Sequence, residues 1–318
     1  MATSAQGDVV AAERWRAAVD GSRGSFGALE PLVCFYDALT GVNGVDAMLA
    51  DARCAIRELG RDSSWYPSAL VLEGLALLVS GEEDAAIEVL QYAAEAAERY
   101  GTLPAAAFAL AACSLHVGAR GAPVKAGELA AHAGELLEGT DLERHATCAL
   151  TPVAVARWQM QRGDPGAARR TLQQAYSLMP LLTWALPVIS MYTLLEMADT
   201  AIGLADIAGA RQILREASRI VRKRPLGRLD DRFRTLQDLL DTLPTGDTGV
   251  STLTAAELRL LPHLATHLSF PEIGESLYIS RHTVKTQAMA IYRKLGASTR
   301  SEAVAAAREV GLLPVREV

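Results

Sequence analysis

Aromatic residues, cysteines and excess positive charge are all scarce in this sequence. Only 5% of the 318 residues are aromatic, and 31 Lys and Arg stand against 37 Asp and Glu, which gives a net charge of −6. An acidic chain does not coat nucleic acid along its whole length, although one small basic face is compatible with this total. The 25 glycines and 13 prolines are ordinary numbers, which excludes collagen-like and disordered chains.

The sequence has little chemistry that could hold a metal or a cofactor. Its four cysteines are far apart and form no C-x-x-C pair: Cys34, Cys54, Cys113 and Cys148. We expect them to be reduced, buried, small apolar residues. His263 and His267 have the i, i+4 spacing of some zinc ligands, but no third ligand is apparent and a role at a helix end is favoured. We therefore expect no cofactor and no metal.

Signals for catalysis, export and membrane insertion are absent as well. No phosphate loop of the form G-x-x-x-x-G-K-[ST], no Ser-His-Asp order and no paired-carboxylate pocket is apparent, so we do not expect an enzyme. The first residues lack a basic stretch followed by an apolar core, and the expected location is the cytoplasm. Thr171 to Leu195 carries no formal charge over 25 residues, but Pro180 and Pro187 divide it. This predicts two buried helix segments rather than a membrane span.

From about Leu32 to Lys223 the apolar residues follow a helical period, and the pattern repeats. Glycines recur at steps of 40 to 42 residues, each followed by a similar phrase: Gly41, Gly81, Gly121, Gly163 and Gly203. Each repeat predicts a helix, a turn at or near the glycine, and a second helix. The alanine pairs 85–86 and 167–168 are expected to let helices approach closely. Such units stack on their neighbours, as in tetratricopeptide-type arrays, because one pair cannot bury its own apolar face.

The expected fold class is all-α, with a tetratricopeptide-like array followed by a small four-helix domain. Residues 243–251 (LPTGDTGVS) combine Pro, Gly and small polar residues, which is typical of a linker. We predict a segment of uncertain structure at 1–30, a helical repeat domain at 31–243, a linker at 244–251 and the small domain at 252–318. Residues 251–318 carry a net charge of +2 and the rest of the chain −8.

Capping signals divide the C-terminal part into four short helices. Three capping boxes place a hydroxyl three positions before a glutamate: Thr254 with Glu257, Ser269 with Glu272, and Thr299 with Glu302. Leu253 and Leu258 have the spacing of a hydrophobic staple, and Ser280 can cap a further helix. The predicted helices are at about 255–267, 270–277, 281–295 and 300–310, with Pro262 inside the first.

The second and third of these helices follow the helix-turn-helix plan, since only a short turn separates them. An inner apolar stripe is expected on the third helix: Val284, Ala288, Ile291 and Leu295. The opposite face is polar and basic: Arg281, His282, Lys285, Thr286, Met289 and Arg293. Such a face suits the major groove of DNA, where basic side chains meet phosphates and the side chains one turn into the helix meet base edges.

The strings LTAAE, LSFPEIGESLYIS, TVKTQ and IYRKLGASTRSEAV resemble the LuxR/FixJ-type helix-turn-helix domain over about residues 251–313. The resemblance implies a bacterial protein that binds double-stranded DNA as a homodimer and pairs through its last helix. It places three residues at base edges: Lys285, Thr286 and Met289. It places four residues at phosphates: Ser280, Thr283, Arg293 and Lys294. We expect Arg281 and Gln287 to contact phosphates as well. The chain departs from the family at Ala256, Pro262 and Gln287.

The repeats and the terminal domain together resemble regulators related to MalT, whose ATPase module has no counterpart in this sequence. We expect a transcription regulator of LuxR type whose repeats respond to a protein partner, a small effector or self-association. The alternative is a helical-repeat interaction scaffold whose terminal domain has lost DNA binding.

Overall fold

The computed structural model describes residues 30–242, 253, 255–277, 279–309 and 312–313, together with residues 10, 14, 17 and 18. Across these residues the secondary structure is helical and contains no strand, which confirms the all-α expectation. Most of the segment expected at 1–30 and the linker expected at 244–251 lie outside the described residues.

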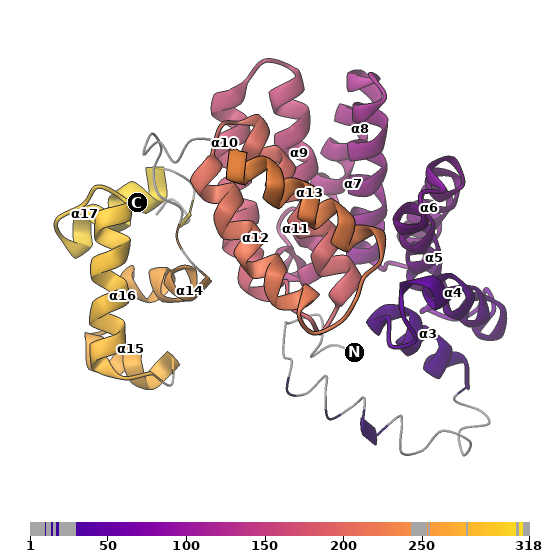
Figure 1. The fold of residues 1–318 in the computed structure, drawn as a ribbon, viewed down its shortest axis with the longest axis horizontal. Coiled ribbons are helices and arrows are strands. Elements are labelled where there is room, and N and C mark those ends of the chain that lie inside the picture. The colour runs from indigo at the N-terminus through magenta and orange to yellow at the C-terminus, as the bar shows by residue number, and fades with distance from the viewer. Residues whose placement is uncertain are drawn as a thin grey trace.

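Helices α3 to α12 form five consecutive pairs, and α13 follows them (Figure 1). The pairs are α3 (Glu30–Thr40) with α4 (Val45–Leu59), α5 (Tyr66–Ser80) with α6 (Glu83–Arg99), α7 (Leu103–Ala119) with α8 (Pro123–Glu135), α9 (Leu150–Gln161) with α10 (Pro165–Leu178), and α11 (Pro187–Gly203) with α12 (Ile207–Val221). Helix α13 spans Arg228–Thr242, and three short 3-10 helices lie between pairs: η2 (Asp141–Arg144), η3 (Ala146–Ala149) and η4 (Met179–Leu181).

The repeating glycines lie at the turns inside the pairs. Gly81 follows α5 with φ 87°, and its N–H donates to the carbonyls that end the helix. A side chain strains this left-handed conformation, so glycine is favoured there. The fifth repeat differs, because Gly203 is the last residue of α11 and Ala205, with φ 59°, makes the turn instead.

Small residues let the paired helices approach closely, although they are not always the expected ones. Ala86 is fully buried, whereas its neighbour Ala85 is exposed. A closer approach occurs at Gly74, where an added Cβ would lie 2.5 Å from Leu90 Cγ of the facing helix. Successive helix positions point about 100° apart, so only one alanine of an adjacent pair can face the partner helix.

The expectation for the cysteines is wrong for two of the four. Cys34 of α3 and Cys54 of α4 form a disulfide, with their Cα atoms 5.9 Å apart. Cys113 and Cys148 are buried thiols outside the disulfide, as expected. Cys34 and Cys54 are 20 positions apart, and the chain between them turns back on itself through the pairing of α3 with α4. This proximity depends on the helix pairing, which no short cysteine motif reveals.

The uncharged segment 171–195 is divided as predicted. It holds the end of α10, the short helix η4, a connecting segment and the first half of α11, which begins at Pro187. No helix in the described parts of the chain is long and apolar enough to cross a membrane.

The array curls so far that its end meets its beginning. Arg224, just before α13, donates from Nη1 to the carbonyl of Thr40 at 2.7 Å, across 184 residues of chain. Arg228 donates to the carbonyl of Ser80 at 3.3 Å, and α13 and α11 pack against α5 and α3 respectively. Figure 1 shows α13 lying over α11. The last helices of the array therefore pack against its first helices.

A network of ion pairs holds the closing helix. Glu196 of α11 binds Arg157 of α9, with Nη2–Oε2 3.3 Å, and Arg232 of α13, with Nη1–Oε1 2.6 Å. Arg232 also pairs with Asp199. Burial by itself lowers the pKa of Arg232, but the two carboxylates outweigh it and the net shift is upward. The network thus joins α9, α11 and α13.

Replacing Arg232 by alanine should destabilise the array measurably. The change removes charged hydrogen bonds to Glu196 and Asp199, and such bonds contribute about 1.5–3 kcal/mol each. We expect Arg232→Ala to lower the free energy of unfolding by about 2–3 kcal/mol, measured by urea titration. The control is Arg234→Ala on the same helix, whose exposed pair with Asp231 should contribute less than about 0.5 kcal/mol. Equal losses in the two variants would contradict the role of the network.

Candidate nucleic-acid interface

Four helices follow the array: α14 (Ala255–Leu264), α15 (Phe270–Leu277), α16 (Arg281–Lys294) and α17 (Arg300–Glu309). Three of them agree with the predicted bounds to within one residue, but α14 ends at Leu264 rather than at 267. Pro262 lies inside its last turn, where it removes a backbone donor. Pro262, one of the positions where the sequence departs from the LuxR/FixJ-type pattern, thus coincides with a helix that is shorter than predicted.

Arg300 satisfies the carbonyls at the end of α14. Its guanidinium donates to the carbonyl oxygens of His263, Leu264, Thr266 and Leu268 at 2.7–3.0 Å. Helix ends leave such carbonyls without helical partners. One side chain at the start of α17 therefore fixes the loop between α14 and α15.

The capping boxes form at two of the three predicted positions. The Ser269 N–H and hydroxyl both donate to Glu272 Oε2, at 2.7 and 2.6 Å. Glu302 accepts from the Thr299 N–H at 3.3 Å, while the Glu302 N–H donates to Thr299 Oγ1 at 3.2 Å. Thr254 lies outside the described residues.

The turn between α15 and α16 depends on a close approach of the chain to itself. The Ile279 N–H donates to the carbonyl of Gly274 at 2.9 Å, and a Cβ on Gly274 would lie 2.7 Å from the Ile279 carbonyl oxygen. Ser280 then caps α16, because its Oγ accepts from the Thr283 N–H at 3.1 Å. The requirement for glycine sets the angle at which α16 leaves the turn.

The two faces of α16 are divided as the sequence predicted. Val284, Ala288 and Ile291 are fully buried, and Leu295 just past the helix is half-buried. Ile273 of α15 is also fully buried, and α15 packs against α16. The polar face is solvent-exposed at five positions: Arg281, His282, Lys285, Thr286 and Arg293. Met289 lies among them and is 54% exposed, which is unusual for a large apolar side chain.

The remaining predicted site residues lie at the margins of this face. Ser280 is exposed, and Thr283 and Gln287 are half-buried. Lys294 is different: its Nζ lies 2.6 Å from Glu257 Oε2, and the two side chains are only 15% and 7% exposed. Glu257 was expected to take part in a capping box, and here it pairs with Lys294 across α14 and α16. The ammonium of Lys294 is thus engaged inside the fold.

His263 and His267 belong to no group of possible metal ligands in the described part of the chain. Among the described residues, no three His, Cys, Asp or Glu side chains are grouped as a metal site requires. The His263 carbonyl instead accepts hydrogen bonds from Arg300 and Thr266.

Residues 251–307 match the family of "Bacterial regulatory proteins, luxR family". The four C-terminal helices form a LuxR-type helix-turn-helix domain. A stretch of 87 residues is 39% identical to the HTH-type transcriptional activator RamA of Corynebacterium glutamicum. It covers 27% of this chain and 31% of that relative, so the likeness extends over less than a third of either protein.

Sequence reasoning missed three features that shape the LuxR-type domain. Arg300 was noted only as the start of the last helix, Gly274 was not singled out, and the pair of Lys294 with Glu257 was not foreseen. A glycine near the end of a helix and just before a turn is a usable signal for Gly274. Nothing local marks Arg300 or Lys294, because their partners are about 30 to 37 residues away.

Gly274 provides a test of the turn geometry. Gly274→Ala should destabilise the LuxR-type domain by about 1–3 kcal/mol, because the new Cβ would collide with the backbone of Ile279. Gly134→Ala is the matched control, since Gly134 is also helical and has open space around its Cβ position. That change should stabilise the protein by up to about 1 kcal/mol. Chemical denaturation of both variants measures the change in the free energy of unfolding. A change of the same sign in both variants would refute the close approach.

The two capping glutamates predict an acid-sensitive domain. Hydrogen bonds from Ser269 lower the pKa of Glu272, and the backbone N–H of Ser298 is the main cause that lowers the pKa of Glu302. A glutamate whose pKa is lowered in the folded state stabilises the fold at pH values above its ordinary pKa of about 4.3. This stabilisation is lost as the pH falls through the lowered pKa of the folded state. The double variant Glu272→Gln, Glu302→Gln should therefore lose less stability between about pH 5 and 3, measured by thermal unfolding. Glu275→Gln, an exposed site on α15, is the control and should leave the acid dependence of the parent protein unchanged.

Proposed function

We propose that this protein is a sequence-specific transcription regulator that reads DNA through α16 and is controlled through its helical array. The observation that carries the proposal is the exposed polar face of α16, on which Arg281, Lys285 and Arg293 surround an exposed Met289. Basic side chains attract phosphates, and an exposed methionine offers an apolar contact to a thymine methyl group. The match of residues 251–307 to the luxR family supports the same function.

The proposed contacts follow the position of each side chain on this face. Lys285, Thr286 and Met289 point from the middle of α16 and are proposed to meet base edges. Ser280, Arg281, Thr283, Gln287 and Arg293 surround them and are proposed to meet phosphates. Lys294 was predicted to bind phosphate as well, but its pair with Glu257 supports a positioning role that holds α14 against α16.

The division into an array, a linker and a DNA-binding domain remains part of the proposal, with the boundaries predicted above. The likeness of the array to MalT-related regulators supports a regulatory role for residues 31–243. A homodimer that pairs through α17 would read two half-sites about 10 bp apart, or a multiple of that spacing.

Lys285 tests whether α16 reads sequence. Lys285→Ala should weaken binding to a selected DNA site by about 1–3 kcal/mol and relax the preference at one base position. A binding assay on fragments selected from random DNA measures both effects. Lys125→Ala removes the same charge from the exposed side of α8 and should leave DNA affinity unchanged. Uniform weakening on all sequences would show that Lys285 contacts phosphate only.

Arg293 tests the phosphate contacts separately. Arg293→Ala should weaken binding to all sequences alike and reduce the slope of log affinity against log salt by about one. If neither the full chain nor residues 245–318 bind DNA even at low salt, the regulator is excluded and the interaction scaffold is favoured.

A further inference from the structure

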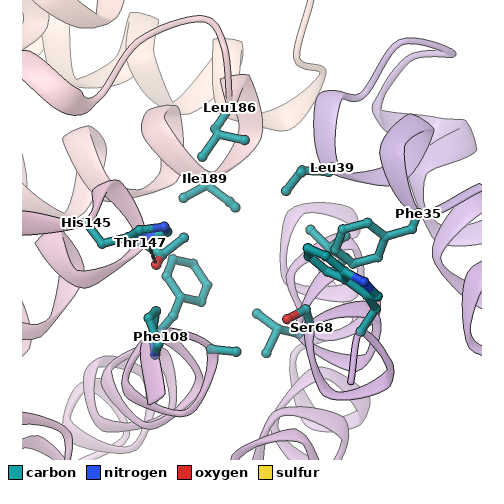
Figure 2. Close-up of a pocket in the computed structure, with 13 residues that line it drawn as sticks. Phe35, Leu39, Ser68, Phe108, His145, Thr147, Leu186 and Ile189 are labelled. Carbon is teal, nitrogen blue, oxygen red and sulfur yellow. Dashed lines mark hydrogen bonds between the residues drawn. The ribbon is translucent and has the colours of Figure 1, made fainter. Parts of the chain in front are cut away.

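A cavity of about 230 Å³ lies inside the curled array, between its first helices and α11 (Figure 2). Its wall comes from five separate segments of the chain: α3, the start of α5, the start of α7, the segment around η3, and the start of α11. Figure 2 shows Phe35, Leu39 and Ser68 on one side of an empty centre, with Phe108, His145 and Thr147 on the other. The contact of α3 with α11 that closes the array also brings two walls of this space together.

The wall of the cavity is apolar over most of its area. Phe35 is 2% exposed and Phe108 1%, and Phe35 packs against Trp65 with ring centroids 5.4 Å apart. Leu186 and Ile189 complete this surface and are also buried. Among the described residues that line the cavity, none carries a permanent charge. An ionic ligand would lose its hydration without gaining a partner here.

His145 and Thr147 bring polar atoms together on one side of the cavity, opposite the hydroxyl of Ser68. His145 Nδ1 lies 2.8 Å from Thr147 Oγ1, and this contact orients the imidazole and leaves Nε2 as its second hydrogen-bonding atom. Burial lowers the pKa of His145, which favours the neutral form of the ring. A neutral imidazole and a hydroxyl suit a ligand with one uncharged polar group.

The volume and the chemistry of the wall decide the kind of occupant. An engineered protein cavity of about 150 Å³ with an apolar lining binds benzene, and this cavity is larger by about half. A peptide would bring backbone N–H and carbonyl groups at every residue, which an apolar wall leaves without partners. A molecule of one or two rings has no backbone N–H or carbonyl groups that would need such partners.

We propose that this cavity binds a neutral small molecule of one or two rings that carries one hydrogen-bonding group. The rings lie between the Phe35–Trp65 pair and Phe108, and the polar group meets His145 and Thr147. The proposal names a chemical class for the effector in the regulatory role proposed above. Its biological meaning rests on that role. The binding itself requires only the array.

The probe is 1-naphthol, and 1-naphthoate is the charged comparison with the same rings. Calorimetry on the full-length protein at pH 7 should show one 1-naphthol per chain, and affinity for 1-naphthoate weaker by at least about tenfold. Failure of 1-naphthol to bind, or equal binding of the two compounds, would overturn the proposal. Binding only after removal of residues 1–29 would also overturn it, because that segment would then be the natural occupant.

Two variants locate the bound probe. Ala105→Phe places a ring in the cavity and should weaken 1-naphthol binding at least about tenfold, whereas Ala85→Phe, at an exposed site on α6, should not change it. Thr147→Val keeps the shape of the side chain and removes its hydroxyl, so it should weaken binding severalfold with an unchanged circular dichroism spectrum. Parental affinity in both Ala105→Phe and Thr147→Val would refute this location. The same protein samples are tested for DNA binding, and a protein that binds 1-naphthol but no DNA refutes the proposed regulator while leaving the cavity site intact.

Discussion

Helix α11 is buried over most of its surface, so neighbouring helices have to cover it on several sides. Fourteen of its 17 residues are buried, and it packs against α9, α12, α13 and α3. Two stacked helix pairs could cover only part of this surface. The curl of the array, the position of α13 and the return of Arg224 to Thr40 all follow from this need. The cavity has the same origin, because its wall is the place where α11 faces the first three pairs without filling the space between them.

Polar pairs inside the LuxR-type domain determine which charges are left on its surface. Lys294 and Glu257 neutralise each other between α14 and α16, and Arg300 is committed to four backbone carbonyls. These contacts leave most of the surface charge of the domain in place, and they hold α16 at a fixed angle. Arg281, Lys285 and Arg293 remain on the exposed face of the helix. In the proposed function, the basic face of α16 would read sequence only if the helix is held in place, and the buried pairs support that requirement.

Features set by neighbours in the sequence were predictable, and features set by the path of the chain were not. The capping boxes at Ser269 and Thr299, the buried stripe of α16 and the turn at Gly81 depend on residues at most a few positions apart. The Cys34–Cys54 disulfide and the contacts of Arg300 and Arg224 join residues that are 20 to 184 positions apart. Lys294 shows the limit clearly. It adjoins Arg293 in the sequence, but the two point about 100° apart on the helix, so one is exposed and the other reaches Glu257.

The uneven charge of the chain bears on the proposed DNA binding. Residues 1–250 carry a net charge of −8 and residues 251–318 a net charge of +2, so DNA phosphates would attract the LuxR-type domain and repel the array. In the proposed regulator, the position of the array relative to that domain would therefore affect DNA affinity. Helix α14 packs against η4, and Leu186 of the cavity wall lies five residues after η4 in the same connecting segment. A ligand that holds Leu186 in one arrangement also restrains the segment that α14 touches. If DNA binding needs a different arrangement, the two ligands must weaken each other by the same factor, because coupling between sites is reciprocal.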